Sequence, residues 1–440
     1  MNIQVPPITA YNLNEGQKAA GDKFLEFLFS DDREFIISGP AGVGKTYLMN
    51  YIIDNTMPRY LEMCKLIGVK PEYTEVVMTA TTNKAAQVLG KATGRPTQTT
   101  ASFFNLTVQN NFQTGETFLK QTNKWKIHQK LIIFVDESSM IDTNLWRMVH
   151  DGTLNCKLVY VGDRHQLAPV SEDLSPIYKQ NSPMVELLTP VRNAGQPALM
   201  AICQQLRDTV ATGIFQPIRP VPGVIDHMDG PQMQAELDQT FQQQNPNARI
   251  LAYTNKQVIR YNDYIRGMRR LPASFQPGEV LVTNSVLHHR HGNIAVEMEV
   301  EVLRDSGFNQ VMVDADHDVR LDVQVLDLKD QFGDVYQDVM FPTNREHFDQ
   351  LTKYYKRMKN WSRMFYLVNN FADLRPRDAA TVHKSQGSTY DTVFVDLGNI
   401  STCNIPSQVA RMLYVAFSRA RSRVILYGDL AQKYGGLDLS

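Results

Sequence analysis

The sequence has few cysteines and no long apolar run. The four cysteines among its 440 residues are scattered and form no CxxC pair; they are Cys64, Cys156, Cys203 and Cys403. This usage suits a reducing cytosol and argues against a zinc site or a disulfide framework. No stretch approaches about eighteen consecutive apolar residues, so we expect no transmembrane helix and no membrane partner. The first residues lack a basic region followed by an apolar stretch, so we expect no secretory signal and a cytoplasmic location.

An excess of charge of one sign is also missing. Lys and Arg total 45 and Asp and Glu total 46, which gives a net charge of −1. This balance does not indicate a nucleic-acid-binding protein, although a locally basic channel could still bind one strand. The apolar content of 43% and charged content of 21% are ordinary for a globular protein. A chain of this length is expected to form about two to four domains.

Short apolar runs that alternate with helical patterns dominate the first 190 residues. Four of them, at residues 35–37, 76–78, 131–135 and 158–161, are each followed by a loop of polar residues. This pattern predicts a parallel sheet flanked by helices, with ligands at the carboxyl ends of the strands. The same pattern returns at residues 250–253, 393–395 and 424–427, which predicts a second α/β domain.

Two interruptions of this pattern predict insertions. We assign residues 1–190 to the first domain, and residues 191–276 with 371–440 to the second. Between them, residues 277–370 form a β-rich and helical insertion, because residues 296–302 alternate and residues 345–371 have a helical, partly basic pattern. Residues 103–130 form a smaller insertion in the first domain, where Thr114-Gly115 predicts a hairpin turn.

The strongest local signal is a glycine-rich loop after the first apolar run. It reads Gly39-Pro40-Ala41-Gly42-Val43-Gly44-Lys45-Thr46 and fits G-x-x-x-x-G-K-[ST] between a strand and a helix. Its backbone N–H groups can cradle phosphates, Lys45 can reach the β- and γ-phosphates, and Thr46 can hold Mg²⁺. The alternative, a glycine-rich turn that matches by chance, does not account for this context. We therefore predict ATP and Mg²⁺ as cofactors.

Polar residues after other strands complete the predicted nucleotide site. Asp136-Glu137 follows the third apolar run, where Asp136 can bind Mg²⁺ and Glu137 can orient the attacking water. Gln166 follows the fourth run and can sense the γ-phosphate, although alone it reads as a loop residue. Gln17 lies three residues after Asn14, a spacing that is also typical of a helix capping box.

Taken in order, these segments resemble the RecD-like, 5′-to-3′ branch of the superfamily 1 helicases. Two late motifs carry the resemblance: Thr381-Val382-His383-Lys384-Ser385-Gln386-Gly387 and Leu413-Tyr414-Val415-Ala416-Phe417-Ser418-Arg419-Ala420-Arg421. It implies two RecA-like P-loop NTPase domains, parallel sheets flanked by helices, with a hairpin insertion in the first and a β-rich, SH3-like insertion in the second. It also implies that Gln17 reads adenine, that Gln166 couples hydrolysis to the second domain, and that Gly387 lies at the nucleotide.

The resemblance also implies two arginines that stabilise the transition state. Arg419 is similar to the arginine finger supplied by the second motor domain, although alone it reads as a surface arginine on a helix. Arg192 is similar to the second arginine. Here the sequence departs from the family, because Pro190 intrudes and the spacing is about one residue short.

Contacts to a DNA strand are expected from loops that face away from the nucleotide. The motif positions are Thr82, Asn83, Lys84, Thr100 and Ser102 in the first domain, and Thr381, His383 and Lys384 in the second. Hydroxyls and backbone amides at a helix N-terminus can grip phosphates without reading bases. Relatives often carry a histidine where this chain has Ser102. A capped helix or a solvated loop is the alternative for each position.

Two further segments could act on DNA. The insertion at residues 103–130 could be a pin that parts the strands, with Phe112, Phe118 or Leu119 near its working end; an aromatic residue in a local core is the alternative. The most basic stretch has cations at Lys353, Lys356, Arg357, Lys359 and Arg363, with Tyr354, Tyr355 and Trp361 among them. Aromatic faces and cations suit single strands, but a solvated helix face is the more common structure.

We therefore expect an ATP-dependent DNA helicase that moves 5′-to-3′ on single-stranded DNA in replication or recombination. There are two alternatives: a translocase that strips proteins from DNA or remodels forks, and a P-loop switch or kinase that does not move along DNA. No carboxylate cluster outside the motifs indicates a nuclease. The expected partners are single-stranded and forked duplex DNA, with replication proteins as further candidates. The resemblance allows a working monomer, and the compact chain suggests a phage or mobile-element enzyme in the host cytoplasm.

Overall fold

The computed structural model describes residues 11–111, 113, 117–169, 172–189, 196–290, 292–294 and 296–439. The chain divides into two compact units, each described by itself. Unit 1 comprises Met1–Thr107, Leu119–Gln216 and Ile405–Ser418; unit 2 comprises Val108–Phe118, Pro217–Asn404 and Arg419–Ser440. The boundaries predicted from the sequence near residues 190, 276 and 370 stay predictions. No described helix is both long and apolar enough to cross a membrane.

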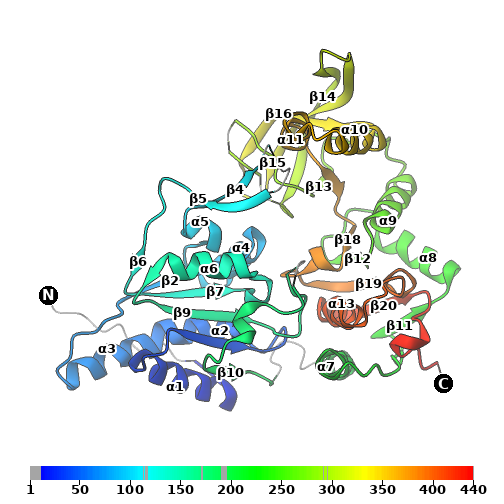
Figure 1. The fold of residues 1–440 in the computed structure, drawn as a ribbon. Helices are drawn as coiled ribbons and strands as arrows, with labels where there is room; N and C mark the ends of the chain where they lie inside the picture. Colours follow the sequence, from blue (N-terminus) through cyan, green and yellow to red (C-terminus); the bar gives the residue numbers. More distant parts are fainter. Residues whose placement is uncertain are drawn as a thin grey trace. The chain divides into compact units, whose positions relative to one another are not determined.

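Unit 1 is built on a six-stranded parallel sheet in the order β10-β1-β9-β7-β2-β3 (Figure 1). Its strands are β1 (Glu34–Ser38), β2 (Glu75–Ala80), β3 (Thr97–Thr99), β7 (Leu131–Asp136), β9 (Lys157–Gly162) and β10 (Met184–Glu186). The four apolar runs predicted as strands are β1, β2, β7 and β9. They hydrogen-bond in parallel, so their carboxyl ends meet at one edge of the sheet.

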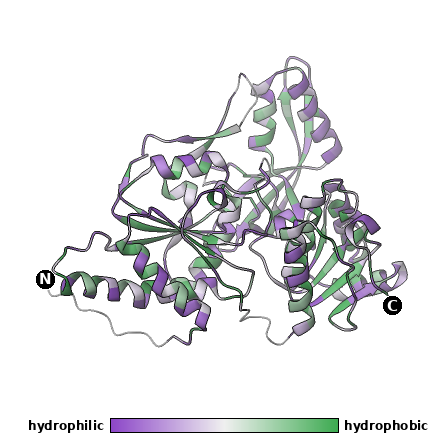
Figure 2. Ribbon diagram, turned by 60° about the horizontal axis from the view of Figure 1, so that its bottom comes forward, coloured by the Kyte–Doolittle hydropathy of each residue, from purple (hydrophilic) through white to green (hydrophobic). Residues whose placement is uncertain are grey.

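Helices cover both faces of this sheet. One face packs against α1 (Glu15–Phe29), α2 (Lys45–Tyr51), the π-helical turn η1 (Ile52–Thr56), α3 (Met57–Leu66) and α4 (Asn83–Thr93). The other packs against α5 (Thr100–Phe103) and α6 (Thr143–Asp151). Neighbouring residues of β1 show the division, since Phe35 and Ile37 join the first core and Ile36 the second. The strands are green in Figure 2 because they are buried on both sides.

The remaining elements of unit 1 are two short strands, two short 3-10 helices and two long α-helices. They are β6 (His128–Gln129), β8 (Thr153–Leu154), η2 (Ser138–Met140), η3 (Pro176–Lys179), α7 (Pro197–Thr212) and α13 (Pro406–Ser418). The helices α7 and α13 pack against each other. In the sequence α13 lies between two strands of unit 2, so its two ends are covalently continuous with that unit.

The predicted hairpin insertion is present. Strands β4 (Leu106–Asn110) and β5 (Thr117–Gln121) pair as a two-stranded sheet. Leu119 packs against the core under α6, whereas Phe118 is 43% exposed. Phe112 and the expected turn at Thr114-Gly115 lie outside the described residues.

Unit 2 contains a five-stranded parallel sheet in the order β11-β20-β19-β12-β18. Its strands are β11 (Ile225–Met228), β12 (Ala248–Ala252), β18 (Ala379–Thr381), β19 (Tyr390–Asp396) and β20 (Ala420–Tyr427). Helices α8 (Gly230–Thr240) and α9 (Asn255–Met268) pack on one face; α12 (Leu397–Ile400), η4 (His383–Ser385) and η5 (Gln432–Tyr434) are short connections. A second α/β domain with a sheet interrupted in sequence is confirmed.

The interruption forms the expected antiparallel sheet, in the order β16-β15-β14-β13-β17. Its strands are β13 (Val280–Thr283), β14 (Glu299–Asp314), β15 (Val319–Asp330), β16 (Val335–Pro342) and β17 (Leu374–Pro376). Helices α10 (Arg345–Arg357) and α11 (Trp361–Asn370) pack on it through Tyr355, Phe365 and Leu367. The helical pattern predicted for residues 345–371 is therefore confirmed.

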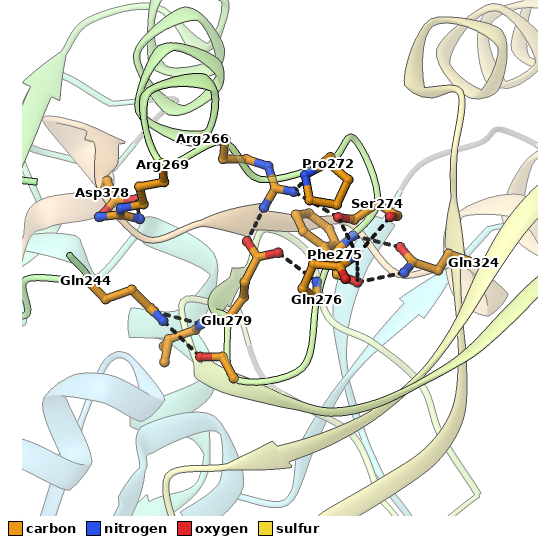
Figure 3. Close-up of polar contacts among 12 residues, drawn as sticks. Gln244, Arg266, Arg269, Pro272, Ser274, Phe275, Gln276, Glu279, Gln324 and Asp378 are labelled. Atoms are coloured by element: carbon orange, nitrogen blue, oxygen red, sulfur yellow. Dashed lines mark hydrogen bonds and ion pairs between the residues drawn. The ribbon is translucent and has the colours of Figure 1, made fainter. Parts of the chain in front are cut away.

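Buried polar groups join this insertion to the parallel sheet of unit 2 (Figure 3). Arg266 on α9 pairs with Glu279 and donates to the carbonyls of Pro272 and Ser274 at 2.6 and 2.9 Å. Gln324 on β15 donates to the Phe275 carbonyl at 2.8 Å and accepts from its N–H at 3.0 Å. The insertion is thus bonded to the domain that carries it at more than one point.

Candidate functional site

The glycine-rich loop joins β1 to α2 at the carboxyl edge of the unit 1 sheet. Gly42 and Gly44 have φ values of +86° and +80°, a region that side chains with a Cβ rarely enter. A Cβ on Gly39 would lie 2.6 Å from the Leu187 carbonyl oxygen. Val43 is fully buried and fixes the loop on the core. The glycines are therefore required by the path of the loop, which presents backbone N–H groups at the start of a helix.

Lys45 folds back over this loop. Its ammonium donates to the carbonyls of Gly39 at 2.7 Å and Pro40 at 3.0 Å. Both carbonyls are neutral acceptors. A phosphate can take their place, because its charged oxygens accept stronger, charge-assisted hydrogen bonds from the ammonium. The half-buried Thr46 follows it in the first turn of α2. The residues thus fit the triphosphate of a nucleotide.

Gln17 forms the capping box that its spacing from Asn14 predicts. Its side chain accepts from Asn14 N–H at 3.1 Å and completes a capping box on α1. The same amide donates to the Val43 carbonyl at 3.1 Å, so it also braces the loop. The side chain is 2% exposed, and the adenine-reading role stays a prediction.

The acidic pair lies at the end of β7. Burial and then the neighbouring Glu137 carboxylate raise the pKa of Asp136 to about 7, while the Lys45 ammonium acts in the opposite direction. Glu137 has a φ of 52°, which turns the chain sharply at the strand end. A cation near Asp136 would favour its charged form.

These residues fit a magnesium ion that arrives with a nucleotide. Mg²⁺ is usually held by one or two carboxylates together with phosphate oxygens and water. Among the described residues, no group of three or more His, Cys, Asp or Glu side chains is placed to hold a metal ion. Asp136 and the Thr46 hydroxyl supply hard oxygen donors of the required kind.

The loop after β9 touches the glycine-rich loop directly, because Gly39 N–H donates to the Gly162 carbonyl at 3.0 Å. Gln166 is 3% exposed, and its Oε1 has no hydrogen-bond partner among the described residues. A buried acceptor without a partner is unfavourable by about 1–3 kcal/mol. Such an oxygen is suited to receive a hydrogen bond from a water or another donor at the nucleotide.

Two residues predicted at the nucleotide lie in unit 2. Arg419 is 3% exposed and donates to the Ser388 carbonyl at 3.2 Å, so a role at a phosphate requires it to leave this partner. Gly387 has a φ of +73° in the turn after η4. Arg192 and Pro190 lie outside the described residues.

The residues of unit 1 that we expect to contact a DNA strand differ in their exposure. Thr82 caps α4 by accepting from Ala85 N–H at 3.2 Å, and Asn83 is exposed beside it. Lys84 is half-buried and Ser102 exposed. Thr100 is fully buried, and its hydroxyl donates to the Ala80 carbonyl at 3.2 Å. Because that hydroxyl already has a partner in the core, the geometry favours a structural role for Thr100.

The residues of unit 2 that we expect to contact a DNA strand already form hydrogen bonds or an ion pair within that unit. Lys384 pairs with Glu297 at 2.8 Å and also donates to the Asn284 side chain. Burial lowers the pKa of His383. The buried Thr381 accepts from Lys384 N–H at 3.3 Å. A phosphate bound by Lys384 would therefore compete with the Glu297 carboxylate.

The structure adds residues that the sequence interpretation did not assign. Asp163 lies between the fourth apolar run and Gln166, Tyr414 lies in the late motif that begins at Leu413, and Arg411 comes just before that motif; none of the three was given a role. Tyr414 donates to Asp163 at 2.5 Å across 251 positions of sequence. Only their position in or beside segments with a predicted role could have indicated them, because the contact is long-range.

Comparisons with known proteins match both α/β parts of the chain to known families. Residues 12–216 match the family described as AAA domain, and residues 378–427 match the UvrD-like helicase C-terminal domain. The chain is 22% identical to the ATP-dependent DNA helicase Dda of Enterobacteria phage T4, over 94% of this chain and 99% of that one. It is 21% identical to the uncharacterized protein R530 of Acanthamoeba polyphaga mimivirus, over 93% and 99%.

A solved structure shares the fold. The Pif1 helicase from Bacteroides, in complex with ADP-AlF3 and ssDNA, aligns with a TM-score of 0.53 and 14% identity. The alignment covers 98% of this chain and 95% of that one, so the two chains share a fold over nearly their whole length.

Proposed function

We propose that this chain, a superfamily 1 DNA helicase powered by ATP hydrolysis, travels 5′-to-3′ along single-stranded DNA and opens forked duplexes in replication or recombination. The observation that carries the proposal is the ordered set of motifs on two α/β domains, in a chain that aligns with nearly the whole length of the phage T4 helicase. The Bacteroides relative, which was solved with ssDNA, supports a single strand as the track.

Each predicted residue has a chemical role in this proposal. Lys45 and the loop N–H groups bind the phosphates, Thr46 and Asp136 hold Mg²⁺, and Glu137 orients the attacking water. Gln166 responds to the γ-phosphate through a water at the nucleotide, which can donate to the Oε1 that has no partner among the described residues. Arg419, and Arg192 where the family pattern holds, would neutralise transition-state charge, an effect of roughly 10³–10⁵ in rate in characterised NTPases.

The strand is held by groups that do not read bases. Thr82, Asn83 and Lys84 lie at the start of α4, where helix N–H groups can bind phosphates. Thr381, His383 and Lys384 would supply the contacts of the second domain. Alternating grip by the two domains, driven by ATP binding and release, would advance the protein.

The decisive experiment compares duplexes that carry a 5′ or a 3′ single-stranded tail. We expect strand displacement only with the 5′ tail, and ATP hydrolysis that rises on adding single-stranded DNA. Glu137→Gln should bind ATP and DNA but hydrolyse slowly. Equal displacement from both tails, or a preference for the 3′ tail, would overturn the polarity, and hydrolysis indifferent to DNA would favour a track-free ATPase.

A translocase without unwinding activity is the second candidate, and the hairpin distinguishes the two. Separating one base-pair step costs on average about 1.4 kcal/mol, so an exposed apolar tip can help to trap melted bases. Phe118→Ala should abolish displacement and retain DNA-stimulated hydrolysis, because Phe118 is exposed and outside the core. Val108→Ala, which removes another exposed apolar side chain of the hairpin, is the matched control. Loss of both activities in Phe118→Ala would contradict the pin.

A further inference from the structure

Helix α13 is bonded to the loop that carries Gln166 by two side chains on one face. Arg411 donates to the Arg164 carbonyl at 3.0 Å and also to the Gln166 carbonyl. Tyr414, three residues later, donates its hydroxyl to the Asp163 carboxylate at 2.5 Å. Residues three apart lie on one side of a helix, so the two contacts form a single seam along the loop.

Tyr414 and Asp163 are the buried members of this seam. Tyr414 is 1% exposed and Asp163 fully buried. Burial alone would raise the pKa of Asp163, but hydrogen bonds and the Lys45 ammonium outweigh it and lower the pKa. Arg411 is half-buried, and burial lowers its pKa although the Asp163 carboxylate acts in the opposite direction. Its guanidinium is held by the two backbone carbonyls of the loop.

A second helix steadies the same loop. Arg207 on α7 pairs with Glu186 at 2.5 Å, and its Nε–H donates to His165 Nδ1 at 3.2 Å. His165 Nδ1 also lies 3.4 Å from the Asp163 carboxylate. Asp163 accepts from the His165 backbone N–H at 3.0 Å and from Tyr414.

The seam connects two parts of the proposed catalytic machinery. On one side, the Gly162 carbonyl accepts from Gly39 at the start of the glycine-rich loop. On the other, α13 ends at Ser418, so Arg419 follows the helix directly. A movement of the Gln166 loop on nucleotide binding would act on α13 through the two side chains that hold it.

We propose that Arg411 and Tyr414 are positioning residues that couple the nucleotide state of the Gln166 loop to Arg419 through α13. This inference rests on the proposed function, since it assigns Gln166 and Arg419 their roles at the nucleotide. It predicts that loss of either side chain leaves ATP binding intact and impairs the conversion of hydrolysis into unwinding.

The experiment compares Tyr414→Phe and Arg411→Lys with the wild-type chain. Tyr414→Phe removes one hydroxyl from the seam, and Arg411→Lys keeps the charge but cannot reach both carbonyls with the same geometry. We expect affinity for a fluorescent ATP analogue within about twofold of wild type, and DNA-stimulated kcat lower by about 10- to 100-fold, the equivalent of one charge-assisted hydrogen bond. The base pairs unwound per ATP should fall in both variants.

Ser407→Ala, at an exposed position of the same helix, is the control and should match the wild type in every measurement. The double variant Asp163→Asn with Tyr414→Phe should lose no more activity than Asp163→Asn alone, because the two side chains share one interaction. Thermal unfolding checks that each variant is folded, and Arg411→Lys provides the test if Tyr414→Phe is not.

The outcomes separate the two proposals. A wild-type chain whose ATP hydrolysis does not respond to DNA would overturn the proposed function. A DNA-stimulated wild type with folded variants that unwind as many base pairs per ATP would overturn the coupling role alone. Variants that lose only ATP affinity would also contradict it, since that result assigns Arg411 and Tyr414 to nucleotide binding.

Discussion

Gly44 is the residue at which the nucleotide loop tolerates least change. Its φ of +80° is unfavourable for any residue with a Cβ by about 1–2 kcal/mol, and a Cβ there would lie 2.5 Å from Gln17 Nε2. We expect Gly44→Ala to lose ATP binding, as measured by titration with a fluorescent analogue. Gly68→Ala is a matched control, because Gly68 has a φ of +75° with no atom within 4 Å of its Cβ position. Equal loss of ATP binding in both variants would contradict a local effect.

Glu34 determines how one part of unit 1 responds to acid. Burial raises its pKa, but hydrogen bonds from His150 at 2.6 Å, Ser182 at 2.7 Å and Trp146 at 3.2 Å outweigh burial and lower it. A carboxyl group whose pKa is lower in the folded state stabilises the fold above its unfolded pKa of about 4.3. That stabilisation is lost as the pH falls through the lower, folded value.

Glu34→Gln should therefore lower the free energy of unfolding at pH 7 and flatten its decrease below pH 5. Chemical denaturation at pH 7, 5 and 4 measures both effects. Glu26→Gln, at an exposed position of α1, should keep the wild-type dependence. An unchanged acid slope in Glu34→Gln would rule out this network as its source.

At the scale of elements, the basic stretch divides into structural and exposed members. Tyr355 is 2% exposed and donates to Asp314 at 3.1 Å, and Arg363 donates to the Val313 carbonyl at 2.7 Å. These two side chains fix α10 and α11 to the insertion. The remaining cations, Lys353, Lys356, Arg357 and Lys359, are exposed and available to phosphates.

Replacing these four cations with Gln should flatten the salt dependence of single-strand binding. Each lost contact reduces the slope of log K against log salt by about 0.7, so a fully engaged patch would lose roughly 3. Binding titrations between low and moderate salt measure the slope. Lys65→Gln with Lys70→Gln, exposed in unit 1, is the control. An unchanged slope in the fourfold variant would mean that these cations form a solvated helix face and do not bind DNA.

Elements with local signals could be predicted from the sequence. The apolar runs became β1, β2, β7 and β9 because strands buried on both faces need no polar positions. The glycine-rich loop could also be predicted, because its backbone conformation requires glycine at fixed positions. The π-helical turn η1 had no such signal, because its apolar spacing does not distinguish it from the helices on either side.

Contacts between distant segments could not be predicted. Thr100 occupies a motif position, yet its burial follows from β2 and β3 closing over it. The bond from Tyr414 to Asp163 spans 251 positions, and nothing in either motif specifies that pairing. Sequence therefore located the chemistry of the site, whereas the connections among its parts required the structure.

For the whole molecule, the attachment of the insertion decides how much of unit 2 behaves as one body. Arg269 pairs with Asp378 through two hydrogen bonds of 2.8 and 2.9 Å, and Arg266 lies 4.9 Å from the Phe275 ring (Figure 3). Both chain segments that enter and leave the insertion are thus held by arginines at the end of α9, the buried Arg266 and the half-buried Arg269 that caps the helix. Breaking such a pair by removing one partner costs about 3–5 kcal/mol.

Gln324 provides the sharpest test of this attachment, because its side chain is fully buried and bonds both backbone groups of Phe275. Gln324→Ala leaves a buried N–H and a buried carbonyl without partners, each at a cost of about 1–3 kcal/mol. We expect faster amide exchange at residues 271–280, and unchanged exchange in the glycine-rich loop, which belongs to unit 1. Gln310→Ala, at an exposed position of β14, should change neither segment. Unchanged exchange at residues 271–280 would mean that the ion pairs of α9 suffice to hold the insertion. Faster exchange together with fewer base pairs unwound per ATP would show that the motor depends on this rigid attachment.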